Sequence, residues 1–210
     1  MSMSAWEKAS KTLLANLQDS LKRSTPEEVS RFCSFVLETK SRGGAVYLLA
    51  VGRSLEVLRM FGARIMKPPI SVVTRPLALA PKPHIEDIDS ALICTGTGET
   101  ATVLSMTKSW LAINKNVGLI SSFSAKDCPS TIFSLVRKPN VLILLPGTTL
   151  RDIERRRKNP EEIHTPLLEL FHDKTVFVPS PTLFELTALL FLESAVTQLF
   201  FACKGDTPCP

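Results

Sequence analysis

The sequence predicts an α/β fold, a single domain with a five-stranded parallel sheet flanked by helices in three α/β/α layers. Short apolar runs of strand length recur between residues 45 and 145, and helical segments separate most of them. Each run is apolar on both faces, as expected of parallel strands buried between two layers of helices.

The composition favours a folded, soluble chain. It has 210 residues, of which 44% are hydrophobic and 21% charged, so a sizeable core can form. The net charge of +5 suits an anionic metabolite, although the basic run Arg151–Lys158 can account for most of it. That run is most simply a solvated loop. Because no aromatic residues interleave it, nucleic acid is not an expected partner.

Cysteine usage and hydropathy indicate a cytoplasmic protein without a membrane anchor. The five cysteines are scattered, with no Cys-x-x-Cys pair, which is typical of neither a disulfide framework nor a zinc site. Residues 1–23 lack the apolar stretch of a signal peptide. The segment from Leu183 to Phe201 approaches membrane-span length, but Glu185 and Glu193 interrupt it. We therefore expect a helix that is buried in the core or in a subunit interface.

Two helices are predicted in residues 1–40. Four leucines at helical spacing mark the first helix: Leu13, Leu14, Leu17 and Leu21. The second begins at Thr25, which is the N-cap, with Pro26 at the first helical position and Glu28 completing a capping box.

Residues 44–146 are predicted to form the α/β core. The five strands are predicted at residues 45–51, 70–73, 91–94, 117–120 and 141–145. The helices between them are predicted at residues 54–66, 100–113 and 128–136. The proline-rich connection between the second and third strands is predicted to be a loop.

The strand–helix alternation stops beyond the core. Residues 147–178 are predicted to form a basic loop and an extra helix capped by Asn159, and residues 181–203 a C-terminal helix. No internal repeat and no second core is visible, so residues 1–210 are interpreted as one domain.

The residues suited to chemistry follow the first and third strands. Ligands of open parallel sheets bind beyond the carboxyl ends of the strands. Glycine lets the backbone approach an oxyanion, and a helix N-terminus favours negative charge. Two turns here combine glycine with hydroxyl side chains and open a helix. The predicted phosphate-binding residues are Gly52, Ser54, Thr95, Gly96, Thr97, Gly98 and Thr100.

Neither turn matches a nucleotide-binding motif. The Lys-Ser/Thr ending of a Walker loop is absent, and so is the Gly-x-Gly-x-x-Gly fingerprint. Glycine, serine and threonine are also ordinary turn residues, and either turn alone more often has a structural role. Two such turns on the first and third strands of one sheet favour the phosphate site.

Four segments match the motifs of one family in the same order. They are residues 52–54 followed by 61–66, then 95–100, 145–148 and 182–186. With these segments the sequence resembles the sugar isomerase (SIS) domains, and among them the 6-phospho-3-hexuloisomerases, from about Val46 to Leu199. The resemblance implies a flavodoxin-like SIS domain whose hydroxyl loop holds the phosphate of a phosphorylated sugar. Since SIS domains commonly pair through C-terminal helices, it also implies a homodimer or homotetramer.

The sequence departs from the family pattern at four places, one of which is a longer segment from Leu150 to Lys174. Ala50 stands at the first glycine of Gly-x-Gly-Arg-Ser, and threonines replace serines at Thr95 and Thr97. Pro179-Ser180-Pro181 replaces Pro-Met-Gly ahead of the C-terminal helix, and proline reproduces neither the backbone freedom of glycine nor its N–H donor. The catalytic end of the pattern is therefore altered more than the phosphate site.

Glu185 is the predicted catalytic base, with His84 as a second candidate acid or base. Moving a carbonyl between adjacent sugar carbons requires a group that removes a proton from carbon and returns it. One carboxylate whose pKa is raised by apolar surroundings can do both. Alternatively, Glu185 only complements the helix dipole, but the family resemblance favours catalysis. His84 lies in the loop after the second predicted strand, where a surface histidine without a role is the commoner case.

Three functions remain open at this point. The chain is an isomerase of phosphorylated ketoses, a phosphosugar-binding or regulatory protein without chemistry, or a structural or nucleic-acid-associated protein that kept the fold. The presence of Glu185 favours the isomerase, and the altered segment Pro179-Ser180-Pro181 favours the binding or regulatory protein. With only three histidines and no cluster of metal-ligand residues, no metal is expected, and an enediol route needs no organic cofactor.

Overall fold

The sheet of the computed structural model has five parallel strands in the order β2-β1-β3-β4-β5. The structure describes residues 24–77, 84–122, 132–145 and 182–205, together with scattered helical positions between residues 7 and 22. The strands are β1 (Val46–Leu49), β2 (Thr74–Pro76), β3 (Ser90–Thr95), β4 (Val117–Ser121) and β5 (Val141–Leu144). This confirms the predicted parallel α/β sheet.

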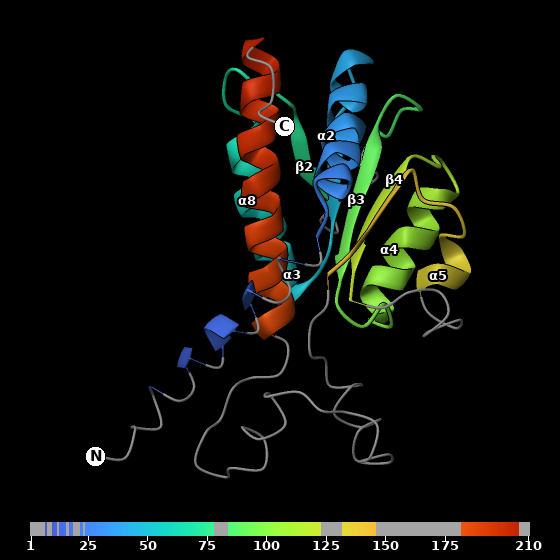
Figure 1. The fold of residues 1–210 in the computed structure, drawn as a ribbon. Coiled ribbons are helices and arrows are strands. Elements are labelled where there is room, and N and C mark those ends of the chain that lie inside the picture. Colours follow the sequence, from blue (N-terminus) through green and yellow to red (C-terminus); the bar gives the residue numbers. More distant parts are fainter. Residues whose placement is uncertain are drawn as a thin grey trace.

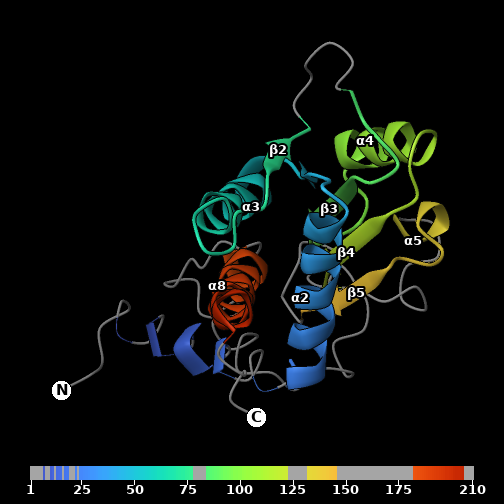
Figure 2. The same cartoon turned by 90° about the horizontal axis from the view of Figure 1, so that it is seen from above.

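Helices cover both faces of the sheet (Figures 1 and 2). One face carries α2 (Pro26–Ser41), α3 (Gly52–Ile65) and α8 (Thr182–Lys204). The other carries α4 (Ala101–Leu111) and α5 (Ile132–Leu135). The helices that follow β1 and β3, which are α3 and α4, therefore leave the sheet on opposite sides.

Alternate residues of β1 enter different cores. Leu48 of β1 packs with α2, α3 and α8, whereas its neighbour Tyr47 packs with Trp110 of α4 at a ring-centroid distance of 5.2 Å. In the first core, Phe32 of α2 contacts Phe61 of α3 and Phe191 of α8, with centroids 5.6 and 5.4 Å apart. The central strands β1, β3 and β4 are thus buried on both faces, which explains their continuous apolar sequences.

The predicted N-terminus of α2 is confirmed. The Glu28 N–H donates to the Thr25 hydroxyl oxygen at 3.2 Å, and the Thr25 N–H donates to the Glu28 carboxylate at 2.9 Å. Two backbone donors that the helix itself cannot satisfy are thereby paired.

The prediction for the second strand was wrong by four residues. Ile70 and Val72 are buried, as their apolar character suggested, but neither lies in a strand. The Val72 N–H donates to the carbonyl oxygen of Ile65 at 2.8 Å, so this segment wraps around the end of α3. Pairing with β1 begins only at Thr74. An apolar run indicates that its residues are buried, and here Ile70 and Val72 are buried beside the end of α3 instead of in a strand.

Several predictions fall wholly or partly outside the described residues. The basic run Arg151–Lys158, the helix capped by Asn159 and the segment Pro179-Ser180-Pro181 lie outside them. Of the helix predicted over residues 128–136, only α5 is described.

The C-terminal helix α8 packs against both α2 and α3. By length and composition alone, Leu183–Lys204 would suffice to cross a membrane, with a mean hydropathy of 1.7. However, its residues Phe184, Phe191 and Ala195 are at most 1% exposed within the protein, as in a core helix. Leu190 and Phe201 are exposed on its outer side, and assembly into a homodimer or homotetramer stays a prediction.

The packing of α3 predicts a strong difference between two neighbouring substitutions. Leu58 is fully buried, so Leu58→Ala should lower the free energy of unfolding by about 2–5 kcal/mol. Met60 is 52% exposed, and Met60→Ala should change it by less than about 1 kcal/mol. Urea denaturation measures both. Equal losses in the two variants would contradict the arrangement of α3.

Candidate functional site

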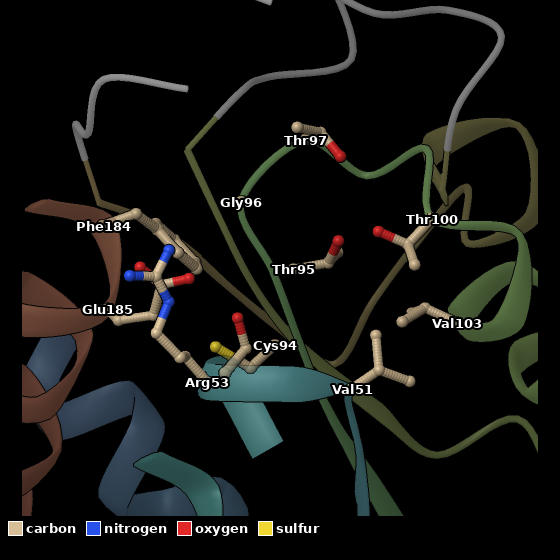
Figure 3. Close-up of a pocket in the computed structure, with 11 residues that line it drawn as sticks. Val51, Arg53, Cys94, Thr95, Gly96, Thr97, Thr100, Val103, Phe184 and Glu185 are labelled. Carbon is tan, nitrogen blue, oxygen red and sulfur yellow. The ribbon is translucent and has the colours of Figure 1, made fainter. Parts of the chain in front are cut away.

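A cavity of about 280 Å³ opens where the chain leaves β1 and β3. Because α3 and α4 depart to opposite faces, a crevice remains between the carboxyl ends of these adjacent strands, the point at which sheets of this strand order bind ligands. Three segments line it: the start of α3, the loop at residues 95–100 and the first turn of α8 (Figure 3).

The loop at residues 95–100 is fixed by its own hydroxyl groups. The Gly98 N–H donates to the Thr95 hydroxyl oxygen at 3.1 Å, and the Glu99 N–H donates to that of Thr97 at 3.2 Å. Ser122 of the neighbouring strand end anchors the carbonyl oxygen of Gly96. A hydroxyl that accepts one bond keeps its own hydrogen to donate. Thr95 and Thr97 can therefore still donate to an anion in the cavity.

Most of the predicted phosphate-binding residues come together at this cavity. Those whose atoms line it are Ser54, Thr95, Gly96, Thr97 and Thr100. Gly52 and Gly98 do not line it. They have left-handed backbones with φ of +57° and +68°, a conformation that glycine adopts without strain. Their role is to turn the chain at the edge of the cavity.

Gly96 lets the C-terminal helix approach the loop closely. A Cβ atom at this position would lie 3.2 Å from the ring of Phe184, tighter than ordinary contacts. Phe184 is 1% exposed and precedes Glu185 in the first turn of α8. Packing of the Phe184 ring on Gly96 thus places the Glu185 side chain at the cavity, opposite the hydroxyl groups (Figure 3).

The Glu185 carboxylate occupies a partly desolvated position. Burial raises the pKa of Glu185, and the positive charge of Arg53 and a hydrogen bond with the Ser54 side chain lower it only in part. Its Oε2 atom is buried without a hydrogen-bond partner among the described residues. The combination is typical of a group held for proton transfer.

Cys94 extends the apolar side of this environment. It lies near the carboxyl end of β3, is 1% exposed and lines the cavity. Burial raises the pKa of the Cys94 thiol, and the charge of Glu185 raises it further. Cys94 therefore remains a neutral thiol, which packs beside the carboxylate and offers no nucleophile.

The structure does not bring His84 together with Glu185 in this chain. The His84 side chain is 85% exposed and lies 3.5 Å from the Glu86 carboxylate. It lines a different cavity, together with Gly44 and Asp89, at the amino ends of the strands. The cavity that contains Glu185 lies at the carboxyl ends of the strands, so the two cavities are at opposite ends of the sheet.

Sequence reasoning gave no role to Arg53, although it stands inside a matched motif. A cation in the first turn of a helix faces the positive end of the helix dipole, which is unfavourable unless an anion is near. An arginine between Gly52 and Ser54 is therefore a signal that could have identified it. Among the described residues, no group of three or more His, Cys, Asp or Glu could hold a metal ion.

The sequence comparisons assign no family or activity to this chain. No protein-family model matches the sequence. A protein of Archaeoglobus fulgidus, described as uncharacterized, is 24% identical over 157 residues, which cover 74% of this chain and 70% of the relative.

Several solved structures have the same fold. One is a Methanococcus jannaschii protein with an inferred function of 3-hexulose-6-phosphate isomerase (20% identity, TM-score 0.63, 94% of this chain and 92% of that one). Another is the Vibrio vulnificus NanR protein complexed with ManNAc-6P (13% identity, TM-score 0.62, 98% of this chain and 66% of that one). A third is the sugar isomerase domain of the RpiR transcription factor from Sphaerobacter thermophilus (10% identity, TM-score 0.55, 93% of this chain and 93% of that one). At these identities the likeness establishes the fold.

The partly buried carboxylate predicts that Glu185→Gln stabilises the protein at neutral pH. The pKa of Glu185 is raised above its ordinary value of 4.5, so the native state binds more protons than the unfolded state above that pH. The contribution of Glu185 to the free energy of unfolding of the wild type should then fall as the pH rises above 4.5. The urea midpoint of Glu185→Gln should exceed that of the wild type at neutral pH, and the difference should shrink toward pH 4.5.

Glu193→Gln is the matched control for this measurement. Glu193 lies farther along α8, half-exposed, and its carboxylate pairs with Arg64 at 3.4 Å. The urea midpoint of Glu193→Gln should show no increase over that of the wild type that grows with pH. An equal loss of stability in Glu185→Gln at both pH values would contradict the desolvated position of the carboxylate.

Proposed function

We propose that this protein is a SIS-family isomerase of phosphorylated ketoses, acting on a pair such as 3-hexulose 6-phosphate and fructose 6-phosphate. The observation that carries the proposal is the position of the Glu185 carboxylate. It lies partly desolvated, across a small cavity from a loop of hydroxyl donors at the ends of β1 and β3. The sequence motifs, and the phosphosugar bound by a protein of the same fold, support the same choice.

The hydroxyl loop is suited to the phosphate of the substrate. Ser54, Thr95, Thr97 and Thr100 offer donors without a competing negative charge. Two helix N-termini, those of α3 and α4, open at the same place and add favourable dipoles. The volume of about 280 Å³ lies near the lower end of the range for small-molecule sites, which suits a compact metabolite.

Glu185 would carry the proton between the two sugar carbons. In a 3-ketose, its carboxylate takes the proton from C2, and the electron pair of that C–H bond forms a C2–C3 double bond as the C3 carbonyl oxygen becomes an enediolate oxygen. The C2 hydroxyl then passes its hydrogen to this oxygen, and the carboxylic acid returns the proton to C3 as the C2 oxygen becomes the carbonyl. Both carbons exchange oxidation state within the substrate, so the reaction balances without a redox partner.

A phosphosugar-binding protein without chemistry is the second candidate. The sequence observation in its favour is Pro179-Ser180-Pro181, where the family pattern has Pro-Met-Gly before the catalytic helix. The fold comparison is compatible with it, since a sugar isomerase domain of the same fold belongs to a transcription factor. In this case the cavity would bind the same ligand, and Glu185 would contact it without transferring a proton.

Removing one hydroxyl from the loop should weaken sugar-phosphate binding. Thr97→Val keeps the side-chain shape and deletes a donor to a charged group, so affinity for fructose 6-phosphate should fall about 10- to 100-fold. Thr197→Val is the matched control, because Thr197 lies on α8 and its hydroxyl donates to the Glu193 carbonyl oxygen. Isothermal titration calorimetry measures both. Unchanged affinity in Thr97→Val would remove this loop from the phosphate site.

Removing the basicity of Glu185 should abolish most of the isomerase activity. Glu185→Gln should lower the rate about 10²–10⁴-fold, with sugar-phosphate affinity little changed. A coupled isomerase assay with a chelator present measures the rate, and Glu193→Gln should retain full activity. Full activity of Glu185→Gln would exclude Glu185 from the mechanism. An inactive wild type that still binds fructose 6-phosphate would favour the binding protein.

A further inference from the structure

We propose that Arg53 is the positioning residue of this site and that it exchanges partners when a phosphorylated ligand binds. In this structure its guanidinium group lies beside the Glu185 carboxylate, and its charge acts on that carboxylate. When a phosphate occupies the hydroxyl loop, the guanidinium moves to the phosphate, and Glu185 is released to accept a proton. This inference rests on the proposed function, because it requires an anionic ligand at the loop.

The position of Arg53 fits this role. It is the second residue of α3, directly after the left-handed turn at Gly52. Its guanidinium group lies beside the Glu185 carboxylate, where the first turns of α3 and α8 face one another (Figure 3). The side chain is exposed and lines the cavity, so it can pivot toward a ligand without disturbing the core.

The charges of the cavity favour the exchange. Among the described lining residues, Arg53 carries the one positive charge and Glu185 the one negative charge. A phosphate on the loop brings up to two further negative charges close to Glu185. The guanidinium fork binds phosphate oxygens in pairs, and attraction to the more highly charged anion exceeds attraction to a single carboxylate. Arg53 therefore gains more from the phosphate than it loses from Glu185.

The exchange would strengthen the base at the moment the substrate is present. While Arg53 is close, its charge lowers the pKa of Glu185 against the effect of burial. Once Arg53 turns to the phosphate, burial dominates and the carboxylate binds a proton more tightly. A sugar without phosphate would leave the pair of Arg53 and Glu185 intact. The pocket would then select phosphorylated substrates in the chemical step as well as in binding.

Few other groups of the described chain face Glu185. Ser54 of α3 contributes a hydrogen bond, and Cys94 of β3 contributes a neutral thiol. The salt bridge between Arg64 and Glu193 lies farther along α3 and α8. On α2, Cys33 faces the Ala195 carbonyl oxygen, also farther along α8. Arg53 is thus the charged group whose movement would change the titration of Glu185.

Carbon-13 NMR of the glutamate carboxyl groups tests the exchange without requiring isomerase activity. The Glu185 signal is assigned by its loss in Glu185→Gln. Its pKa is then measured in the wild type and in Arg53→Met, each with and without saturating inorganic phosphate. Amide shifts of Gly96 and Gly98 report phosphate binding separately. Arg53→Lys keeps the charge, and Arg59→Met removes an exposed arginine of α3 that pairs with Glu56.

The proposal expects two results. Arg53→Met raises the pKa of Glu185 in the phosphate-free protein, whereas Arg53→Lys largely restores it and Arg59→Met has no effect. Phosphate raises the pKa of Glu185 further in the wild type than in Arg53→Met, because the wild type also loses the attraction of Arg53. An equal rise in both proteins, or no effect of Arg53→Met without phosphate, would overturn the exchange. Absence of phosphate binding, visible in the amide shifts, would overturn the proposed function as well.

Discussion

The pairing of β1 with β3 is the constraint on which the site depends. These strands are neighbours in the sheet but not in the sequence, and the helices that follow them cover opposite faces. The two chain segments must therefore separate at the carboxyl edge, which leaves a crevice lined by backbone turns and helix N-termini. The hydroxyl groups at residues 95–100 and the start of α3 are brought together by this topology.

The C-terminal helix completes the crevice from the side. Phe184 packs on Gly96, so the first turn of α8 meets the hydroxyl loop at residues 95–100 directly, and burial raises the pKa of the adjacent Glu185. Stability and function oppose one another here. A carboxylate that is useful as a base must be desolvated, and desolvation of its charged form destabilises the fold. The charge of Arg53 and the hydrogen bond with Ser54 offset part of that penalty.

Much of this arrangement could be predicted from the sequence, for physical reasons. Parallel strands buried on both faces must be apolar throughout, so four of the five were located by hydropathy alone. The second strand was misplaced, because Ile70 and Val72 are buried around the end of α3 without joining the ladder. The loop was recognisable because it needs glycine and hydroxyl groups together. The separation of His84 from Glu185 depends on three-dimensional packing, which hydropathy does not encode.

In the proposed mechanism, Glu185 removes a proton from a sugar carbon while the hydroxyl loop holds the phosphate. Proton NMR of fructose 6-phosphate in D₂O detects this step, because a proton that passes through a carboxylate exchanges with solvent. The wild type should replace a carbon-bound hydrogen of the sugar by deuterium, and Glu185→Gln should not. Deuterium incorporation at the wild-type rate by Glu185→Gln would contradict it.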